Sequence, residues 1–297
     1  MSILARPLSN VVLQSRLARP GASDPAPALP ATMANHTIKA FDADLRDLKR
    51  RVAEMGGLVE RQIVDEVDAL TKSDIMLAQR VITADDKVDM FQRGIERMGV
   101  EIIARRQPMA VDLREIVGAL RISNDLERIG DLAKNIAKRV IALQGEAVPR
   151  RLIRGLMHMT ELVLGQVKCV LDSYARLDVP AAVAVWKSDH EIDAITGSLF
   201  EELMSHMRED PQNVTFGIHL LFCAKNIERK GDHATNIAEI VHYVVEGQVL
   251  RAVRPKGDTT SLTIGCADRL KRQRRAAWLD SADCAVALPA VVDERRR

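Results

Sequence analysis

The sequence has few aromatic residues, few cysteines and no long apolar run. Aromatic residues make up 3% of the 297 residues, whereas apolar residues make up 47%, and this mix favours helices over strands. No stretch of about 18 uncharged apolar residues occurs, which excludes a membrane-spanning helix. Arg6 interrupts the only early apolar run, which excludes a secretory signal. We therefore expect a globular helical protein that stays in the cytoplasm and does not insert into a membrane.

The motifs of several enzyme classes are also missing. The four cysteines lie far apart without a Cys-x-x-Cys pair, so we expect buried free thiols rather than a disulfide framework or a thiolate zinc site. His-Glu-x-x-His does not occur, and there is no phosphate-binding glycine-rich loop or Gly-x-Ser-x-Gly turn. Because no catalytic nucleophile is visible, the sequence predicts a protein that is not an enzyme.

The two ends of the chain differ from its middle in composition. Five of the 11 prolines lie in the first 30 residues, so residues 1–34 are expected to be a disordered arm or a mis-annotated extension that precedes a true start at Met33. Residues 251–297 carry 11 basic and 6 acidic residues and are expected to form a disordered, solvated tail. The remainder, residues 35–250, has a net charge of −5, which argues against a nucleic-acid partner.

The middle of the chain has a helical period. Apolar residues recur there at steps of three and four, as in Leu45, Leu48, Val52, Met55 and Val59. The four prolines of this region fall where a helical pattern stops or begins. The pattern predicts six helices, at about 37–70, 74–106, 110–143, 150–177, 180–208 and 213–246. Ser73 and Asp178 are the expected N-caps, and Gly247 is the expected residue after the last helix.

An internal repeat divides the helices into two sets of three. Residues 124–137 align with residues 225–238 at an offset of 101, with eight identities in fourteen positions. Residues 85–89 align with residues 189–193 at an offset of 104. The sequence therefore predicts an all-α fold made of two tandem three-helix bundles, at residues 35–146 and 149–250.

The repeated residues include acidic pairs four positions apart, which lie on one face of a helix. Because short connections make consecutive helices antiparallel neighbours, each bundle could bring four carboxylates together. The first set is Asp85, Asp89, Glu127 and Asp131, and the second is Asp189, Asp193, Glu228 and Asp232.

Four ionised carboxylates at one place repel each other, and a divalent or trivalent cation would neutralise them. Oxygen ligands suit Mg, Ca, Mn or Fe, with His190 and His233 as occasional further ligands. The alternative is that the acids form ion pairs with Arg128, Lys134 or Arg121 on a solvated helix face.

Each repeated helix also carries a glycine, Gly130 or Gly231, although a glycine inside a helix costs about 1 kcal/mol relative to alanine. Close approach of another backbone or access for an ion would offset that cost. A helix kink is the alternative explanation.

The Glu-Arg-x-Gly-Asp helices resemble those of the PhoU family, the accessory and regulatory proteins of phosphate-specific transport. The resemblance covers about residues 33–255 and extends to the segments at 33–42 and 105–114. Two three-helix bundles with an acidic E/D-x-x-x-D pattern are typical of that family. Here the pattern stands at Glu127 and Asp131 and at Glu228 and Asp232, with further pairs on the preceding helices. Residues 1–32 and about 257–297 find no counterpart in it.

The resemblance implies a cytoplasmic, dimeric regulator that is not an enzyme. Such a protein lowers the expression of phosphate-starvation genes when phosphate is plentiful, by linking the ATPase subunit of the phosphate ABC transporter to the sensor histidine kinase. It also implies metal ions on the carboxylate patches, as iron or zinc clusters or as Mg or Mn. Two hypotheses compete with this one: a carboxylate-bridged metalloenzyme on a helical bundle, and a metal-free helical adaptor.

Overall fold

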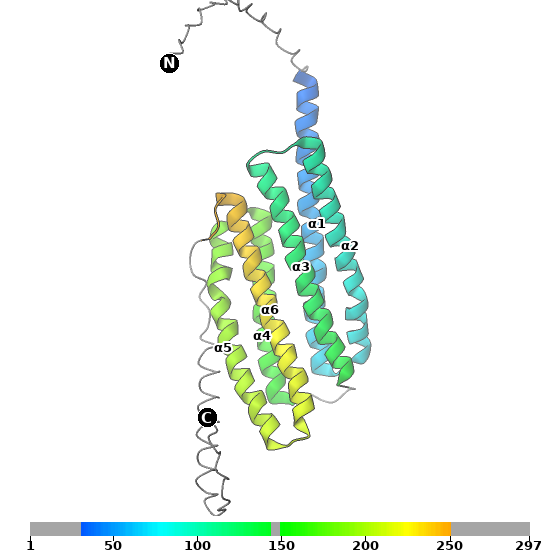
Figure 1. The fold of residues 1–297 in the computed structure, drawn as a ribbon, viewed down its shortest axis with the longest axis vertical. Coiled ribbons are helices and arrows are strands. Elements are labelled where there is room, and N and C mark those ends of the chain that lie inside the picture. The colour runs from blue at the N-terminus through cyan, green and yellow to red at the C-terminus, as the bar shows by residue number, and fades with distance from the viewer. Residues whose placement is uncertain (1–30, 144–148, 251–297) are drawn as a thin grey trace, which may run out of the picture. The chain divides into compact units, whose positions relative to one another are not determined.

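The structure, a computed structural model, describes residues 31–143 and 149–250, with side chains from residue 39. These residues form six α-helices and, within the described ranges, no strand, so the expected all-α fold is confirmed (Figure 1). The helices are α1 (Ala31–Lys72), α2 (Ile75–Arg106), α3 (Val111–Ala142), α4 (Arg150–Arg176), α5 (Val179–Glu209) and α6 (Asn213–Glu246). In the same part of the chain, no helix is both long and apolar enough to cross a membrane.

The helix boundaries agree closely with the sequence pattern, with one larger difference. Helix α1 begins at Ala31 rather than near residue 37, because the last proline of the N-terminal arm is Pro30 and helix-compatible residues follow it directly. Among the described residues, 31–40 belong to one compact unit, and 41–143 and 149–250 belong to another. The expected N-terminal extension at residues 1–34 therefore ends too late, because residues 31–34 belong to α1. Residues 1–30 and the expected tail at residues 251–297 lie outside the described residues.

Aspartates cap the second helix of each bundle. The Asp74 carboxylate accepts a hydrogen bond from the Leu77 backbone N–H at 2.9 Å, and Asp178 accepts one from Ala181 at 3.0 Å. The expectation that Ser73 would be an N-cap is therefore wrong by one residue: Ser73 has φ 52°, whereas a capping residue has extended backbone. Gly247 has φ 70° and donates its N–H to the Tyr243 carbonyl, which confirms its predicted position after α6.

The duplication extends into the first helix of each bundle. Buried residues of α1 correspond to buried residues of α4 at the same offset of 104 that relates Asp74 to Asp178. The matched core pairs are Leu48 and Leu152, Val52 and Leu156, Met55 and Met159, Val59 and Val163, and Ile63 and Val167. Each bundle therefore builds its core on the same plan.

The expectation of buried thiols holds for Cys223 and is wrong for Cys169, which is exposed.

Helices α3 and α6 pack against each other and join the two bundles (Figure 1). The Arg114 guanidinium donates to the Val244 carbonyl at 3.3 Å, near the start of α3 and the end of α6. Farther along α3, the Arg139 guanidinium lies 4.2 Å from the centre of the Phe222 ring, near the start of α6. Since residue numbers rise along α3 as they fall along α6, the two helices run antiparallel.

Candidate functional site: two acidic clusters

The first acidic cluster consists of Asp85 and Asp89 on α2 and Glu127 and Asp131 on α3. Asp85 is only 1% exposed, and its carboxylate accepts a hydrogen bond from Lys134 Nζ at 2.6 Å. Lys134 Nζ also lies 3.9 Å from an Asp131 oxygen. The structure therefore places carboxylates of α2 and α3 around one ammonium group.

The charges in this cluster perturb each other. Burial raises the pKa of Asp85, and the hydrogen bond from Lys134 opposes that rise. Burial and the negative charge of Asp131 both raise the pKa of Glu127. The Arg128 guanidinium lies 3.6 Å from Glu127 and 3.7 Å from Asp131, where it offsets part of the repulsion. The first cluster thus contains its own cations.

Gly130 lies where side chains of two other helices approach α3. A Cβ atom at this position would lie 3.0 Å from Gln62 Oε1 on α1 and 3.2 Å from Asp85 Oδ1 on α2. Close approach thus explains the glycine, although the approaching groups are side chains rather than backbone. Gln62 is 3% exposed, and neither its Oε1 nor its Nε2 atom has a hydrogen-bond partner. A buried amide without partners is costly, so this part of the cluster is poorly satisfied.

The second acidic cluster consists of the corresponding residues, Asp189 and Asp193 on α5 and Glu228 and Asp232 on α6. Asp189 is buried. A Cβ atom on Gly231 would lie 3.8 Å from Asp189 Oδ1 and 3.4 Å from Gln166 Oε1 on α4. Gln166 Nε2 donates to Ser188 Oγ at 3.2 Å, whereas Gln166 Oε1 has no hydrogen-bond partner.

Two of the candidate ligands are directed elsewhere. His233 Nδ1 lies 2.9 Å from an Asp125 oxygen on α3, so this ring takes part in the contact between the bundles. His190 Nδ1 lies 2.8 Å from the Lys187 carbonyl oxygen on its own helix. Arg121, which the sequence offered as a partner for the acids, instead lies over the Tyr243 ring at 6.0 Å.

Gln62 and Gln166 are the site residues that the sequence analysis missed. The two are related by the offset of 104 that also relates Asp85 to Asp189. Extending the repeat alignment to α1 and α4 would have found them. The search for charged ligands passed over them because an amide carries no charge.

The donor atoms suit a metal ion in chemistry but not in their present arrangement. Carboxylate and amide oxygens are the ligands that Mg, Ca and Mn prefer. Among the residues that the structure describes, however, no three His, Cys, Asp or Glu side chains gather closely enough to hold an ion. In the first cluster the Lys134 ammonium takes the position that a cation would need. In the second, Gln166 Oε1 and Asp189 Oδ1 are oxygen atoms near the Cβ position that Gly231 lacks.

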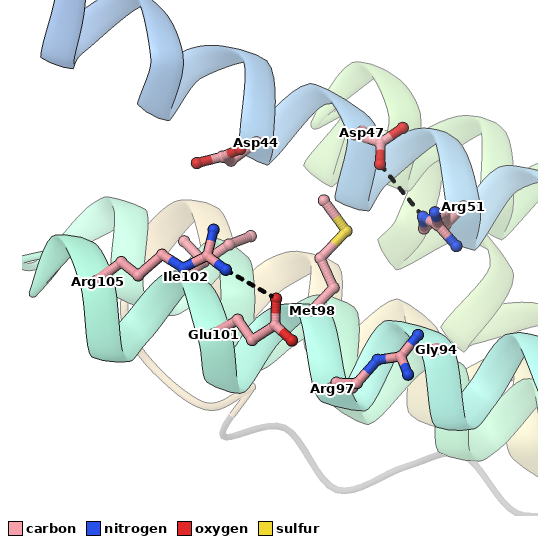
Figure 2. Close-up of a pocket in the computed structure, with 9 residues that line it drawn as sticks. All are labelled: Asp44, Asp47, Arg51, Gly94, Arg97, Met98, Glu101, Ile102 and Arg105. Carbon is pink, nitrogen blue, oxygen red and sulfur yellow. Dashed lines mark hydrogen bonds and ion pairs between the residues drawn. The ribbon is translucent and has the colours of Figure 1, made fainter.

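A separate pocket of about 350 Å³ lies between α1 and α2 (Figure 2). It shares no residue with either acidic cluster, and most of its charged side chains form ion pairs with one another or with neighbours. Arg51 binds Asp47 at 3.2 Å and Arg105 binds Glu101 at 3.4 Å, as Figure 2 shows. Since both signs of charge are balanced within its lining, the pocket has no clear preference for an anion or a cation.

The chain is similar to proteins of phosphate-specific transport along both bundles. The family described as the PhoU domain matches residues 52–140 and 156–241, one match for each bundle. The phosphate-specific transport system accessory protein PhoU homolog of Rhizobium meliloti is 54% identical over 230 residues, which are 77% of this chain and 97% of the relative. The homolog of Caulobacter vibrioides strain NA1000 is 45% identical over 229 residues, 77% of this chain and 100% of the relative.

Two crystal structures resemble the fold. PhoU from Pseudomonas aeruginosa has a TM-score of 0.67 and 39% sequence identity, and the match covers 70% of this chain and all of that one. The phosphate transport system regulatory protein PhoU from Streptococcus pneumoniae has a TM-score of 0.66 and 26% identity, covering 71% of this chain and all of that one. The likeness therefore spans the complete length of both solved chains.

Proposed function

Because the chain belongs to the PhoU family, we propose that it is a negative regulator of the phosphate-starvation response and of phosphate uptake. The observation that carries the proposal is the extent of the match, which includes both PhoU domains and 97% of a relative that is an accessory protein of phosphate-specific transport. In this proposal the protein acts in the cytoplasm by binding other proteins rather than by catalysis.

The partners that we propose are the ATPase subunit of the phosphate ABC transporter and the sensor histidine kinase of the phosphate regulon. The duplicated architecture supports two partners, because α2 and α5 lie on opposite sides of the α3–α6 pair and offer one outer helix from each bundle (Figure 1). The contacts between α3 and α6 hold the bundles together. We further propose that the protein works as a homodimer.

We also propose that the second acidic cluster binds a metal ion, of the Mg, Mn, Fe or Zn group, as a structural or sensing element. The support is chemical: Asp189, Glu228 and the Gln166 carbonyl are oxygen donors on three different helices, and Gln166 Oε1 is buried without a hydrogen-bond partner. These residues would hold the ion between α4, α5 and α6, where its charge would neutralise the acids.

A helical adaptor that works without metal is the second candidate. The observation that favours it is the internal neutralisation of the first cluster by Lys134 and Arg128. Metal analysis of the purified chain, repeated after Asp189→Asn, separates the two candidates. Loss of bound metal in the variant supports the metal-binding regulator, whereas a wild-type chain without metal supports the adaptor.

The regulatory proposal is tested by deleting the gene. Deletion should raise alkaline phosphatase in phosphate-rich medium, and the wild-type gene should restore the low level. An unchanged level would contradict the regulatory role. A phosphate-dependent pull-down from membranes that contain the transporter and the kinase tests the partners directly, and light scattering of the purified chain tests the dimer.

A further inference from the structure

We propose that Lys134 is the resident cation of the first acidic cluster, so that this cluster binds no metal ion in the wild-type chain even though its carboxylates match those of the second cluster. The inference does not depend on the regulatory function. It concerns the part of the proposed function that assigns metal to the clusters, and it makes the two halves of the protein unequal.

The first observation is the position of the ammonium group. Lys134 Nζ lies 2.6 Å from Asp85 Oδ2 and 3.9 Å from Asp131 Oδ1. A metal ion on the Asp85 carboxylate would bind one of its oxygens at about 2.0–2.6 Å and would therefore lie close to this ammonium group. Because a metal ion and an ammonium so close together repel each other, the two cations compete for this carboxylate. The Asp85 side chain is only 2% exposed.

The second observation is that the repeat keeps the acids and changes the lysine. At the offset of 101, Glu127 and Asp131 become Glu228 and Asp232, and Gly130 becomes Gly231, whereas Lys134 becomes Thr235. The Thr235 hydroxyl donates to the Asp232 backbone carbonyl at 2.8 Å, within its own helix. The position that carries a positive charge in the first bundle is therefore neutral in the second.

The second cluster also has a nearby lysine, Lys225, but it does not correspond to Lys134 in the repeat. Lys225 forms an ion pair with Glu228, and its side chain is 58% exposed, compared with 27% for Lys134. An exposed lysine can turn into solvent at small cost, because surface ion pairs contribute little. Lys134 instead reaches a buried carboxylate on another helix, where leaving would strand the charge of Asp85.

The third observation is the oxygen-rich space beside Gly130. Gln62 Oε1 and Asp85 Oδ1 lie 3.0 and 3.2 Å from the same point, the Cβ position that Gly130 lacks. Gln62 is 3% exposed, and its amide atoms have no hydrogen-bond partner. If Lys134 loses its charge, the carboxylates of Asp85 and Asp131 and the carbonyl of Gln62 remain, and this set of hard oxygen ligands suits Mn²⁺.

The test counts Mn²⁺ ions bound to the purified full-length chain, by equilibrium dialysis and electron paramagnetic resonance. Lys134→Thr installs the residue of the second bundle and should bind one more Mn²⁺ per chain than wild type. Lys134→Arg keeps the charge and should bind the same number as wild type. The added ion should disappear in the double variant Lys134→Thr with Asp85→Asn. The reciprocal variant Thr235→Lys should lower Mn²⁺ affinity at the second cluster by at least tenfold.

Two results would overturn the inference. One is a folded Lys134→Thr chain, judged by circular dichroism, that binds no additional ion. The other is an Asp85→Asn chain that binds one ion fewer than wild type, which would show that the first cluster is loaded with Lys134 in place. This second comparison needs only Asp85→Asn, so it still decides the question if Lys134→Thr does not fold.

The experiments distinguish a failure of this inference from a failure of the proposed function. A wild-type chain that binds no Mn²⁺, together with a Lys134→Thr chain that binds one ion, supports this inference and contradicts metal binding at the second cluster. An unchanged alkaline phosphatase level after gene deletion contradicts regulation and leaves the Mn²⁺ count as it is.

Discussion

Lys230 of α6 forms an ion pair with Glu66 of α1, and the two side chains are 0% and 1% exposed. The pair joins helices of different bundles, 164 residues apart in the chain. At the repeat offsets of 101 and 104, the counterparts of Lys230 and Glu66 are Ile129 and Val170, which are both buried and apolar. The duplicated architecture therefore holds a charged pair in one half and apolar residues at the matching positions of the other.

Replacing one member of this pair should destabilise the protein strongly. Lys230→Ile leaves the Glu66 carboxylate buried without its partner, which costs about 3–5 kcal/mol in the free energy of unfolding. The double variant Lys230→Ile with Glu66→Val installs the residues of the matching positions and should recover most of that loss, because well-packed apolar residues can replace a buried ion pair. Urea denaturation measures both.

The matched control for this prediction is the exposed ion pair between Lys72 and Asp68 on α1. Lys72→Ala should change the free energy of unfolding by less than about 1 kcal/mol. A double variant that is no more stable than Lys230→Ile alone would show that the site cannot pack without charge.

The stability contributed by Glu66 should depend on pH. Burial raises the pKa of Glu66 from 4.5 to about 7 in the folded protein, with Lys230 opposing the rise. A raised folded pKa means that the contribution is fully present below about pH 4.5 and is lost as the pH rises through about 7. The free energy of unfolding of wild type minus that of Glu66→Gln should therefore fall over this range.

The titration of Lys230 also makes the stability difference between wild type and Glu66→Gln fall as the pH rises. Burial lowers the pKa of Lys230, whose charged neighbour in this environment is Glu66, with the Cys223 thiol also nearby. Removing the carboxylate lowers the pKa of Lys230 further, so the Glu66→Gln chain gains stability as the pH rises. Urea denaturation at a series of pH values gives the difference, and a difference that rises with pH would contradict the assignment.

Glycines inside the helices should respond to alanine in opposite ways. A Cβ atom on Gly118 of α3 would lie 2.4 Å from Val244 Cγ2 of α6, and a β-branched side chain has little freedom to move away. Gly118→Ala should cost about 1–3 kcal/mol through overpacking between the bundles. Gly57 of α1 has nothing within 4 Å of its Cβ position, so Gly57→Ala should stabilise by about 1 kcal/mol. Thermal unfolding of both variants measures these opposite changes in stability. A stabilising Gly118→Ala would contradict the prediction.

The two described cysteines should differ in reactivity. Burial raises the pKa of the Cys223 thiol to about 12, and the negative charge of Glu66 adds to the rise. Since the thiolate is the reactive form, iodoacetamide at pH 8 should modify exposed Cys169 and spare Cys223 in the folded chain. In urea both should react. Peptide mass spectrometry distinguishes these thiols from Cys266 and Cys284, and rapid labelling of Cys223 without denaturant would show that α6 opens locally.

The sequence by itself determined the helices and their duplication. The three- and four-residue spacing of Leu48, Val52 and Met55 reflects the burial of one helix face, and that information is local. The prolines and the capping residue Asp178 mark helix ends through their own backbone chemistry, so the boundaries could be placed within a few residues. The repeated Glu-Arg-x-Gly-Asp helices predicted which acids belong together in each half.

Only the tertiary structure shows where the basic side chains lie relative to those acids. From the sequence, two ways of neutralising the acids remained: a bound metal ion, or ion pairs with Arg128, Lys134 or Arg121. The sequence could not distinguish them, because these basic residues lie close to the acids along the chain. The direction of each side chain depends on how the helices pack. In the folded protein Arg121 lies over the Tyr243 ring, and Lys134 forms a hydrogen bond with Asp85. The same holds for Lys230 and Glu66, since a pair that forms across 164 residues has no periodic signal in the chain.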